Sequence, residues 1–500
     1  MNQDYEKLAG HIEKMTALQT ALTLFDWDAE TIAPRDSLEM TARMVGQLSS
    51  LYFEALVNEE VKGLLQTLAK ADDLTQAQAA VVRELSKTLS DLEKIPPEEY
   101  RAFRELQAQA TTVWARAKQE NDFDAFAPIL SDMLSYVKKF AAYRRKEGQS
   151  LYDAQLDEYE EGFTKEVLDP FFALLKEKIV PLLKKAAAKN DSFDTSPLRQ
   201  RFDLAKQKEF NRWLAAYIGF DFNRGVMAES EHPFTTELHN HDVRITNHYH
   251  EQAVENAIFS TIHEGGHAIY EMNVADELTQ TPAGGGASCG MHESQSRFME
   301  NMLGRSLAFW EPVYPKLKEY FPQQLKDVGV EDFVRWINKA QPSLIRTEAD
   351  ELTYCLHVMI RYELEKELID GHLSVEELPG AWNDRYEAYL GVRPQNDREG
   401  VLQDIHWSQG SFGYFPSYAL GNAFAAQIYH AMKQELAVEE CLRSGDLAPI
   451  RDWLKEKIHR FGQVKKTRQL LQEVTGEDFN PQYYIDYLIG KFTKLYGLEM

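Results

Sequence analysis

The chain has few cysteines and no long apolar run. Its 500 residues contain only three cysteines, an odd number at wide spacing. That excludes a disulfide framework and suggests a reducing, cytoplasmic compartment. No apolar stretch approaches the roughly 20 residues that a membrane-spanning helix needs. The first ten residues show no basic region followed by an apolar run, so neither secretion by an ordinary signal nor membrane spanning is expected.

Positive charge is also scarce. Acidic residues outnumber basic ones by 79 to 55, which gives a formal net charge of −24. Such a chain has no strong positive field to attract phosphates, so nucleic acid is not an expected partner. With 44% apolar residues the chain can bury a large core. We expect two helical lobes around a cleft, but no clean linker divides them, so residues 1–500 are treated as a single domain.

Apolar residues recur at three- and four-residue spacing over most of the chain, which predicts a mostly α-helical fold. Ile95-Pro96-Pro97 should end one helix and begin the next, because proline suits the first helical turn. The predicted helical ranges are 3–70, 74–94, 97–146, 165–187, 205–220, 310–390 and 418–500.

One region, from about 229 to 250, departs from the helical pattern. Val243, Ile245 and Asn247 alternate with the residues between them, which predicts a strand in a small hairpin. An exposed strand edge here could pair with an extended peptide. Eight of the fourteen histidines fall between positions 232 and 292, which favours a polar site crowded around one metal.

The most informative feature is the segment from His263 to His267, which reads His-Glu-Gly-Gly-His. On a helix the two histidines lie one turn apart on the same face, so both can bind one zinc ion, with Glu264 beside them to take a proton from water. Gly265 and Gly266 each weaken a helix by about 1 kcal/mol relative to Ala, so another element should approach closely there. The flanking apolar residues predict a buried helix; they are Val254, Ala257, Ile258, Ile262, Ala268 and Ile269.

A catalytic zinc needs a third protein ligand and one open position. Tyr270 and Asn273 stand where the metzincin pattern requires Gly and His, so that class is excluded. We favour Glu293, because the turn-forming loop 281–288 lets a second helix return beside the first. Glu271, one turn beyond the second histidine, is the main alternative.

Six short motifs follow one another along the chain. They are His232-Pro233-Phe234, Asp242-Val243-Arg244-Ile245-Thr246, His263-Glu264-Gly265-Gly266-His267, His292-Glu293-Ser294-Gln295-Ser296-Arg297, Ile345-Arg346-Thr347-Glu348-Ala349-Asp350 and Gly400-Val401-Leu402-Gln403-Asp404-Ile405-His406-Trp407. In these motifs, and in the early segment 24–31, the chain resembles the thermostable carboxypeptidase Taq family of zinc metallocarboxypeptidases from end to end.

The resemblance implies a mostly helical, two-lobed gluzincin fold, shared with angiotensin-converting enzyme and the neurolysin-type oligopeptidases, with a deep groove over the metal. It implies homodimers with one Zn2+ per subunit, for which Co2+ is a substitute to test. It also implies removal of single residues from the free C-termini of peptides, with broad specificity that usually fails at C-terminal proline. The alternatives are an oligopeptidase or dipeptidase of the same fold and a non-catalytic helical scaffold.

Chemistry and resemblance together assign the catalytic roles. His263, His267 and Glu293 would hold the zinc, and Glu264 would act as general base. A tetrahedral oxyanion needs a further donor, for which Tyr418 is preferred over Tyr414. His406 and His232 are further candidate donors to the substrate or intermediate.

A free terminal carboxylate suits the bidentate guanidinium of an arginine. Arg346 is the first choice for this anchor. Arg244 and Arg297 follow, although each could instead pair with a neighbouring acid. Asp350 and Asp404 are expected to orient a ligand or an arginine.

Overall fold

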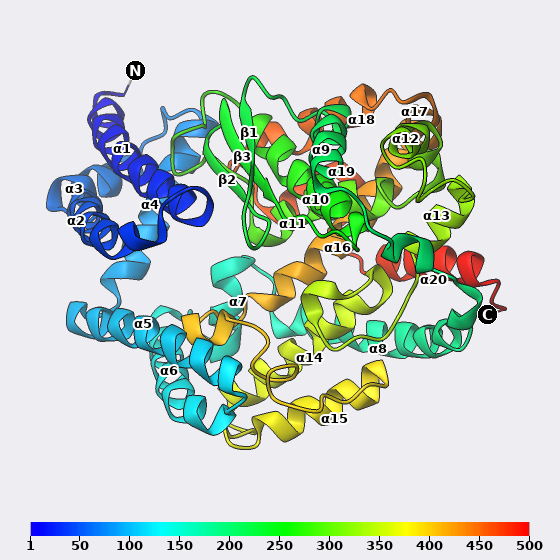
Figure 1. Cartoon of the computed structure of the whole chain (residues 1–500). Coiled ribbons are helices and arrows are strands. Elements are labelled where there is room, and N and C mark those ends of the chain that lie inside the picture. The colour runs from blue at the N-terminus through cyan, green and yellow to red at the C-terminus, as the bar shows by residue number, and fades with distance from the viewer. Residues whose placement is uncertain (1, 500) are drawn as a thin grey trace.

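The computed structural model describes residues 2–499, and helices make up most of it (Figure 1). The first ten helices are α1 (Gln3–Thr31), α2 (Leu38–Leu56), α3 (Glu59–Leu68), α4 (Gln76–Glu93), α5 (Pro97–Glu120), α6 (Phe123–Arg144), α7 (Leu151–Tyr159), α8 (Lys165–Ala187), α9 (Leu204–Ile218) and α10 (Val254–Met272). The second ten are α11 (Cys289–Arg297), α12 (Leu307–Tyr320), α13 (Val330–Ile337), α14 (Glu351–Asp370), α15 (Leu378–Leu390), α16 (Phe415–Glu435), α17 (Val438–Ser444), α18 (Ala448–Lys457), α19 (Thr467–Thr475) and α20 (Gln482–Tyr496). None of the helices in these residues is both long and apolar enough to cross a membrane.

The predicted mostly helical fold is confirmed. Helix α5 begins at Pro97, and α8 covers the predicted range 165–187. The prediction for 310–390 was wrong in part, because residues 338–350 are irregular apart from one 3-10 turn. Pro342 has no backbone N–H to donate, and the Asp350 side chain accepts from two backbone N–H groups to begin α14 afresh.

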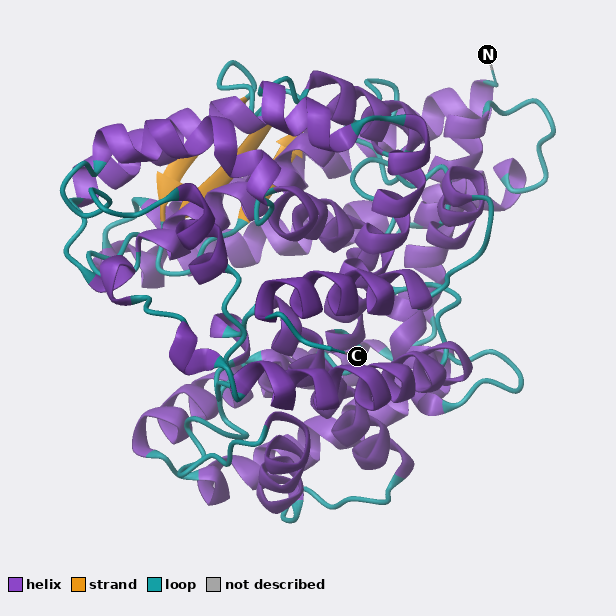
Figure 2. Ribbon diagram, turned by 90° about the vertical axis from the view of Figure 1, so that its right-hand side faces the viewer, coloured by secondary structure: helices purple, strands orange, loops and turns teal. Residues whose placement is uncertain are grey.

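Three strands form one small sheet, which is orange in Figure 2. The sheet lies beside α10 (Figure 1). They are β1 (Gly225–Glu229), β2 (Thr235–His239) and β3 (Asp242–Asn247), in the order β1-β3-β2. The predicted hairpin is the antiparallel pair β2 and β3. Strand β1, which pairs in parallel with β3, was not predicted. Val243 and Ile245 bury their side chains against Ala268 and Met272 of α10, so the sheet supports the helix that carries the two predicted histidine ligands.

The helices gather in three groups (Figure 1). Helices α5 to α8, α14 and α15 lie in the lower half of that view, and the sheet with α9 to α12 and α17 to α19 lies in the upper half. Helix α16 lies between them, and one apolar core runs through both halves. Helices α1 to α4 stand to one side with a small core of their own, which includes Val274, Leu278 and Ala283 from the segment after α10.

Glycines bring three helices unusually close around the predicted ligands. A Cβ at Gly266 of α10 would lie 2.7 Å from the backbone oxygen of Gln295 in α11. A Cβ at Gly421 of α16 would lie 2.5 Å from Cγ of Glu293. Helix α11 is therefore held tightly between α10 and α16, and the close approach expected at the glycines of the predicted metal-binding helix is confirmed.

Candidate active site

The three predicted metal ligands meet at one point. Helix α10 presents His263 and His267, and α11 returns beside it with Glu293. Oε2 of Glu293 lies 3.7 Å from Nε2 of His263 and 3.4 Å from Nε2 of His267. Metal–ligand distances of about 2.0–2.2 Å in a tetrahedral site put the ligand atoms roughly 3.3–3.6 Å apart, so this donor set fits a divalent metal ion. Of the residues that the structure describes, these three form the one such group.

Charged neighbours keep the proposed ligands in the protonation states that bind a cation. Arg297 Nε donates to Oε1 of Glu293 at 2.7 Å, which leaves Oε2 facing the two imidazoles. Burial raises the pKa of Glu293, but Arg297 and the two histidines outweigh it and hold that pKa well below its usual range. Glu300 lies 3.0 Å from Nδ1 of His263. A carboxylate there keeps the proton on Nδ1 and leaves Nε2 free to bind a metal.

Glu264 lies beside the ligands without joining them. Its Oε2 accepts a 2.6 Å hydrogen bond from the Thr235 hydroxyl of β2, and both residues line the cavity. Burial raises the pKa of Glu264 above its usual range, since the interior disfavours the charged carboxylate. A carboxylate with a raised pKa beside a metal site is suited to proton transfer near neutral pH.

Two tyrosines form part of the cavity wall. Tyr414 and Tyr418 line the cavity, and their rings meet edge to face at 5.2 Å. The hydroxyl of Tyr418 lies 3.3 Å from Nε2 of His406, which is partly buried. Burial lowers the pKa of His406 to about 4, so its ring is neutral at pH 7.

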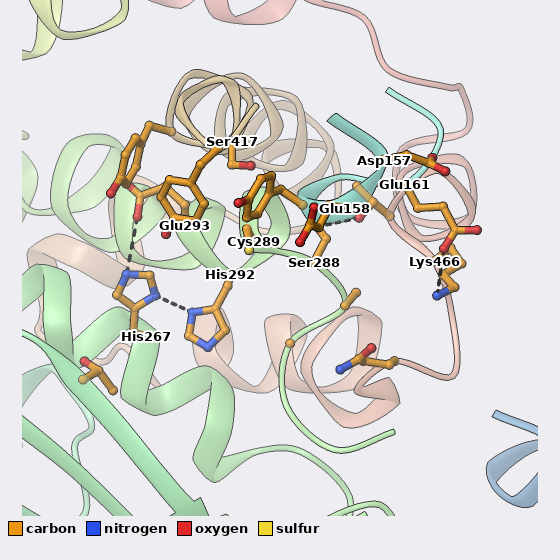
Figure 3. Close-up of a pocket in the computed structure, with 18 of the residues that line it drawn as sticks. Asp157, Glu158, Glu161, His267, Ser288, Cys289, His292, Glu293, Ser417 and Lys466 are labelled. Atoms are coloured by element: carbon orange, nitrogen blue, oxygen red, sulfur yellow. Dashed lines mark hydrogen bonds and ion pairs between the residues drawn. The ribbon is translucent and has the colours of Figure 1, made fainter. Parts of the chain in front are cut away.

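The cavity has a volume of about 610 Å3, and most of its lining residues are of polar or charged types. Figure 3 shows several of them. Six of the predicted site residues line it: His263, Glu264, His267, Glu293, Tyr414 and Tyr418. Other segments that meet here include α4, the end of α7, β2 and the loop before α11. The cavity therefore lies where the N-terminal helices, the sheet and both helical halves come together.

Arg346 lies behind this wall and does not line the cavity. It is 5% exposed, its Nε and Nη2 both donate to Oδ1 of Asp404 at 3.0 and 2.8 Å, and its guanidinium lies 4.9 Å from the Tyr418 ring centre. Asp404 also accepts from Arg361. The expectation that Asp404 orients an arginine agrees with these contacts. Whether Arg346 binds a substrate carboxylate stays a prediction.

The other two arginines are also paired. Arg244 donates twice to Asp242, at 2.8 Å each, and lies over the ring of Trp27 in α1. Trp27 in turn packs edge-on against Phe234, so the early tryptophan segment ties α1 to the sheet. Arg297 lies behind the ligands, as described above, and is likewise absent from the cavity lining.

Two expectations need correction. Asp350 caps α14 by accepting from the backbone N–H groups of Leu352 and Thr353, so it orients a helix end and not a ligand. The histidine concentration is not one site around a metal, because only three of the eight histidines between 232 and 292 line the cavity. The other five belong to the sheet and its loops, and His232 is exposed.

Comparison with known proteins covers the whole chain. Residues 7–492 match the family described as carboxypeptidase Taq (M32) metallopeptidase. The chain belongs to this family. Carboxypeptidase 1 of Bacillus subtilis (strain 168) is 44% identical over 489 residues, which is 97% of each chain. Thermostable carboxypeptidase 1 of Pyrococcus furiosus is 36% identical, over 98% of this chain and 99% of the other.

Solved structures agree. The M32 carboxypeptidase of Deinococcus radiodurans R1 superimposes with a TM-score of 0.97 at 35% identity, over 99% of this chain and 100% of the other. The protein is thus a peptide hydrolase of a metallocarboxypeptidase family, and its substrates are peptides. A metal ion is implied by the family, and the His-His-Glu group is where it fits.

Two residues of this site, Glu300 and Thr235, were not predicted from the sequence. Glu300 follows Glu293 by seven residues, which on a helix is nearly the same face, so helical spacing could have indicated it. Thr235 reaches Glu264 only because the hairpin packs beside α10. No local pattern could have predicted that contact.

Proposed function

We propose that the protein is a zinc carboxypeptidase that releases single residues from the C-termini of peptides with broad specificity, except at C-terminal proline. The observation that carries the proposal is the convergence of His263, His267 and Glu293, with Glu264 beside them, in a cavity of a metallocarboxypeptidase fold. Two imidazoles and a carboxylate suit zinc in a catalytic site. The chemistry that zinc supplies when bound is polarisation of the scissile carbonyl and a lowered pKa of the attacking water, from 15.7 to about 7.

Glu264 is the proposed general base. Its carboxylate accepts the proton of the attacking water and then delivers it to the leaving amine. The Thr235 hydroxyl binds one oxygen, Oε2, and so fixes the orientation of the carboxylate within the cavity. The raised pKa favours the first transfer, because the conjugate base of a weaker acid accepts a proton more readily. The leaving amine is far more basic than a carboxylate, so the second transfer is still favourable.

Tyr418 is the proposed donor to the oxyanion. The Nδ1 atom of His406 is buried with no hydrogen-bond partner among the described residues. A buried N–H without a partner is rarer than a buried lone pair, so the proton is placed on Nε2. Nε2–H then donates to the Tyr418 oxygen, and the phenol O–H is left to donate into the cavity. Tyr414 is the alternative donor.

Arg346 remains the proposed carboxylate anchor. Asp404 and the Tyr354 hydroxyl accept from three of its five N–H groups, which leaves two for a substrate carboxylate. Its guanidinium lies against the ring of Tyr418, and that ring lines the cavity. One side chain therefore separates Arg346 from the cavity. Arg297 is the alternative, although both of its partners are acids of the metal site.

The sheet supplies a place for the rest of the peptide. Strand β2 is at the sheet edge, and its residue Thr235, with the preceding Phe234, lines the cavity. We propose that an extended substrate pairs with this edge, so that backbone hydrogen bonds give affinity without sequence preference. We expect a homodimer from the family resemblance and a cytoplasmic location from the scarcity of cysteines. Light scattering of the purified protein would test the dimer.

Mass spectrometry of peptide digests tests the function. The zinc-loaded protein should produce a ladder that shortens one residue at a time from the C-terminus and stops when proline becomes terminal. Zinc removal by a chelator should stop the reaction, and zinc should restore it. Internal fragments, or release of dipeptides, would instead support the oligopeptidase or dipeptidase alternative.

A further inference from the structure

The two histidine ligands are supported in different ways on their outer side. Nδ1 of His263 meets a carboxylate directly, that of Glu300. Nδ1 of His267 instead lies 2.5 Å from Nδ1 of a third histidine, His292, which stands between His267 and the loop before α11 (Figure 3). Nε2 of His292 lies 2.5 Å from Oε1 of Glu271. The three side chains thus form a row, here called the His267–His292–Glu271 chain.

The proton positions in this chain follow from the metal site. Nε2 of His267 faces Glu293 Oε2 and must keep its lone pair to bind a metal, so the proton of a neutral His267 is on Nδ1. Two ring nitrogens 2.5 Å apart can hold only one proton between them, so Nδ1 of His292 is the acceptor. The proton of His292 is therefore on Nε2, and it is donated to the carboxylate of Glu271.

The surrounding sequence holds the His292 ring in this position. The ring of Tyr270 lies 5.3 Å away, centre to centre. A Cβ at Gly286 would lie 2.7 Å from Cδ2 of His292, so the loop can close over the ring only with glycine there. The backbone N–H of Gly286 also donates to Oε1 of Glu271, at 3.2 Å. The glycine loop between α10 and α11 therefore packs against both His292 and Glu271.

We propose that His292 and Glu271 are positioning residues for the metal ligand His267. They hold its proton on Nδ1, fix the plane of its ring and make Nε2 a better metal donor, as carboxylates do for metal-bound histidines elsewhere. Glu271, one of the two acids that the sequence left as third ligand, thus acts on the metal through two imidazoles. The inference rests on the proposed metal site and adds to it the origin of its affinity.

The test compares variants of His292 in the full-length protein, with zinc affinity measured by chelator competition. His292→Phe keeps a ring of similar size but removes the acceptor, and zinc affinity should fall about 10- to 100-fold, the range typical of such outer partners. His292→Gln offers an amide oxygen to His267 and an N–H to Glu271, and should recover much of the affinity. Glu271→Gln keeps an acceptor without the charge and should fall between wild type and His292→Phe.

A second readout separates positioning from packing. The visible absorption spectrum of the Co2+-loaded protein should shift in His292→Phe, because the geometry of one ligand changes. The matched control is His459→Phe, which removes another buried histidine that stacks on Tyr270 and whose ring nitrogens meet Gln295 and Asn273, neither of them a proposed metal ligand. It should lower the melting temperature of the metal-free protein and leave zinc affinity and the cobalt spectrum unchanged.

The outcomes distinguish the inference from the proposed function. If His292→Phe binds zinc within twofold of wild type and gives the same cobalt spectrum, the positioning role is wrong. If His459→Phe loses as much zinc affinity as His292→Phe, the effect is packing and the inference is overturned. If His292→Phe does not fold, the zinc affinities of the other proteins decide. Wild type should bind zinc most tightly, followed by His292→Gln and then Glu271→Gln. Equal affinities would overturn the inference. A wild-type protein that binds neither zinc nor cobalt would instead refute the proposed metal site.

Discussion

At the scale of single residues, Glu264 and the two histidines beside it on α10 have different proposed roles. His263 and His267 point one nitrogen each at Glu293, whereas the Glu264 carboxylate is bound by the Thr235 hydroxyl of β2. Loss of a ligand should therefore lower metal affinity, and loss of the base should lower only the rate. These two effects can be measured separately.

Glu264→Gln should retain zinc and the fold while kcat falls by at least the roughly 10²- to 10⁴-fold of general-base catalysis. The amide still accepts from Thr235 but cannot take a proton from water. Zinc content and kcat are measured on the same preparation. Glu255→Gln, on the first turn of the same helix and paired with Arg199, is the matched control and should be as active as wild type. A zinc-replete Glu264→Gln variant with substantial turnover would exclude this role.

Arg346 should account for the preference for a free C-terminus. A charge-assisted hydrogen bond between its guanidinium and the terminal carboxylate should contribute about 1.5–3 kcal/mol. That is roughly 10- to 150-fold in kcat/KM. Wild type should discriminate strongly against C-terminally amidated peptides, and Arg346→Ala should lose most of that discrimination. Because both changes delete one interaction, their effects should be non-additive. A variant that still prefers the free acid as strongly as wild type would move the anchor to Arg297.

At the scale of elements, the sequence predicts what depends on local periodicity. The apolar stripe of α10 and the start of α5 at Pro97 follow from spacing and backbone chemistry alone. Strand β1 was missed because its five residues show no alternation of apolar and polar side chains. Its partner β3 also comes later in the sequence, after β2, so no local pattern links the two. The burial of Arg346 behind Tyr418 was missed for a related reason, since residues 338–350 pack against segments far away in sequence.

The contact between α11 and α16 should be sensitive to one methyl group. A Cβ at Gly421 would lie 2.5 Å from Cγ and 2.7 Å from Cβ of the ligand Glu293. Gly421→Ala should therefore lower stability by about 1–3 kcal/mol through overpacking and should also weaken zinc binding, because α11 must shift.

The control for this substitution is Gly490→Ala in α20, where an added Cβ meets nothing within 4 Å. It should raise stability by about 0.5–1 kcal/mol, since alanine is the better helix former. Urea unfolding of the metal-free proteins and zinc affinity are the measurements. Equal shifts in the two variants would show that the close approach of α16 to Glu293 is not tight in solution.

At the scale of the whole molecule, one buried acid joins the two helical halves. Glu160, at the end of α7 in the lower half, accepts hydrogen bonds at 2.8 Å from Ser288 Oγ and from the Gly290 N–H, at the start of α11 in the upper half. A carboxylate at a helix N-terminus is favoured by the helix dipole. Burial outweighs these donors and raises the pKa of Glu160 to about 7. The joint between the halves is therefore strongest when Glu160 is protonated.

This gives a testable dependence of stability on pH. In the unfolded chain the pKa of Glu160 is about 4.5, so its contribution to stability is complete below that pH. As the pH rises from about 4.5 through 7 the unfolded state releases the proton first, and roughly 3 kcal/mol is lost. Glu160→Gln keeps an oxygen for Ser288 and Gly290 and cannot ionise. Its stability relative to wild type should therefore increase by most of that amount between pH 5 and 8, in urea unfolding of the metal-free proteins.

The neighbouring Glu161 provides the control for this titration. Burial raises its pKa, but the ion pairs with Lys87 and Lys466 outweigh burial and lower the pKa to about 2. Glu161 is therefore ionised in both the folded and the unfolded state above pH 5, and Glu161→Gln should differ from wild type by a constant amount between pH 5 and 8. If the difference between Glu160→Gln and wild type is just as constant, Glu160 does not titrate in that range. The joint between α7 and α11 would then be independent of pH, and other buried acids would have to account for any loss of stability toward neutral pH.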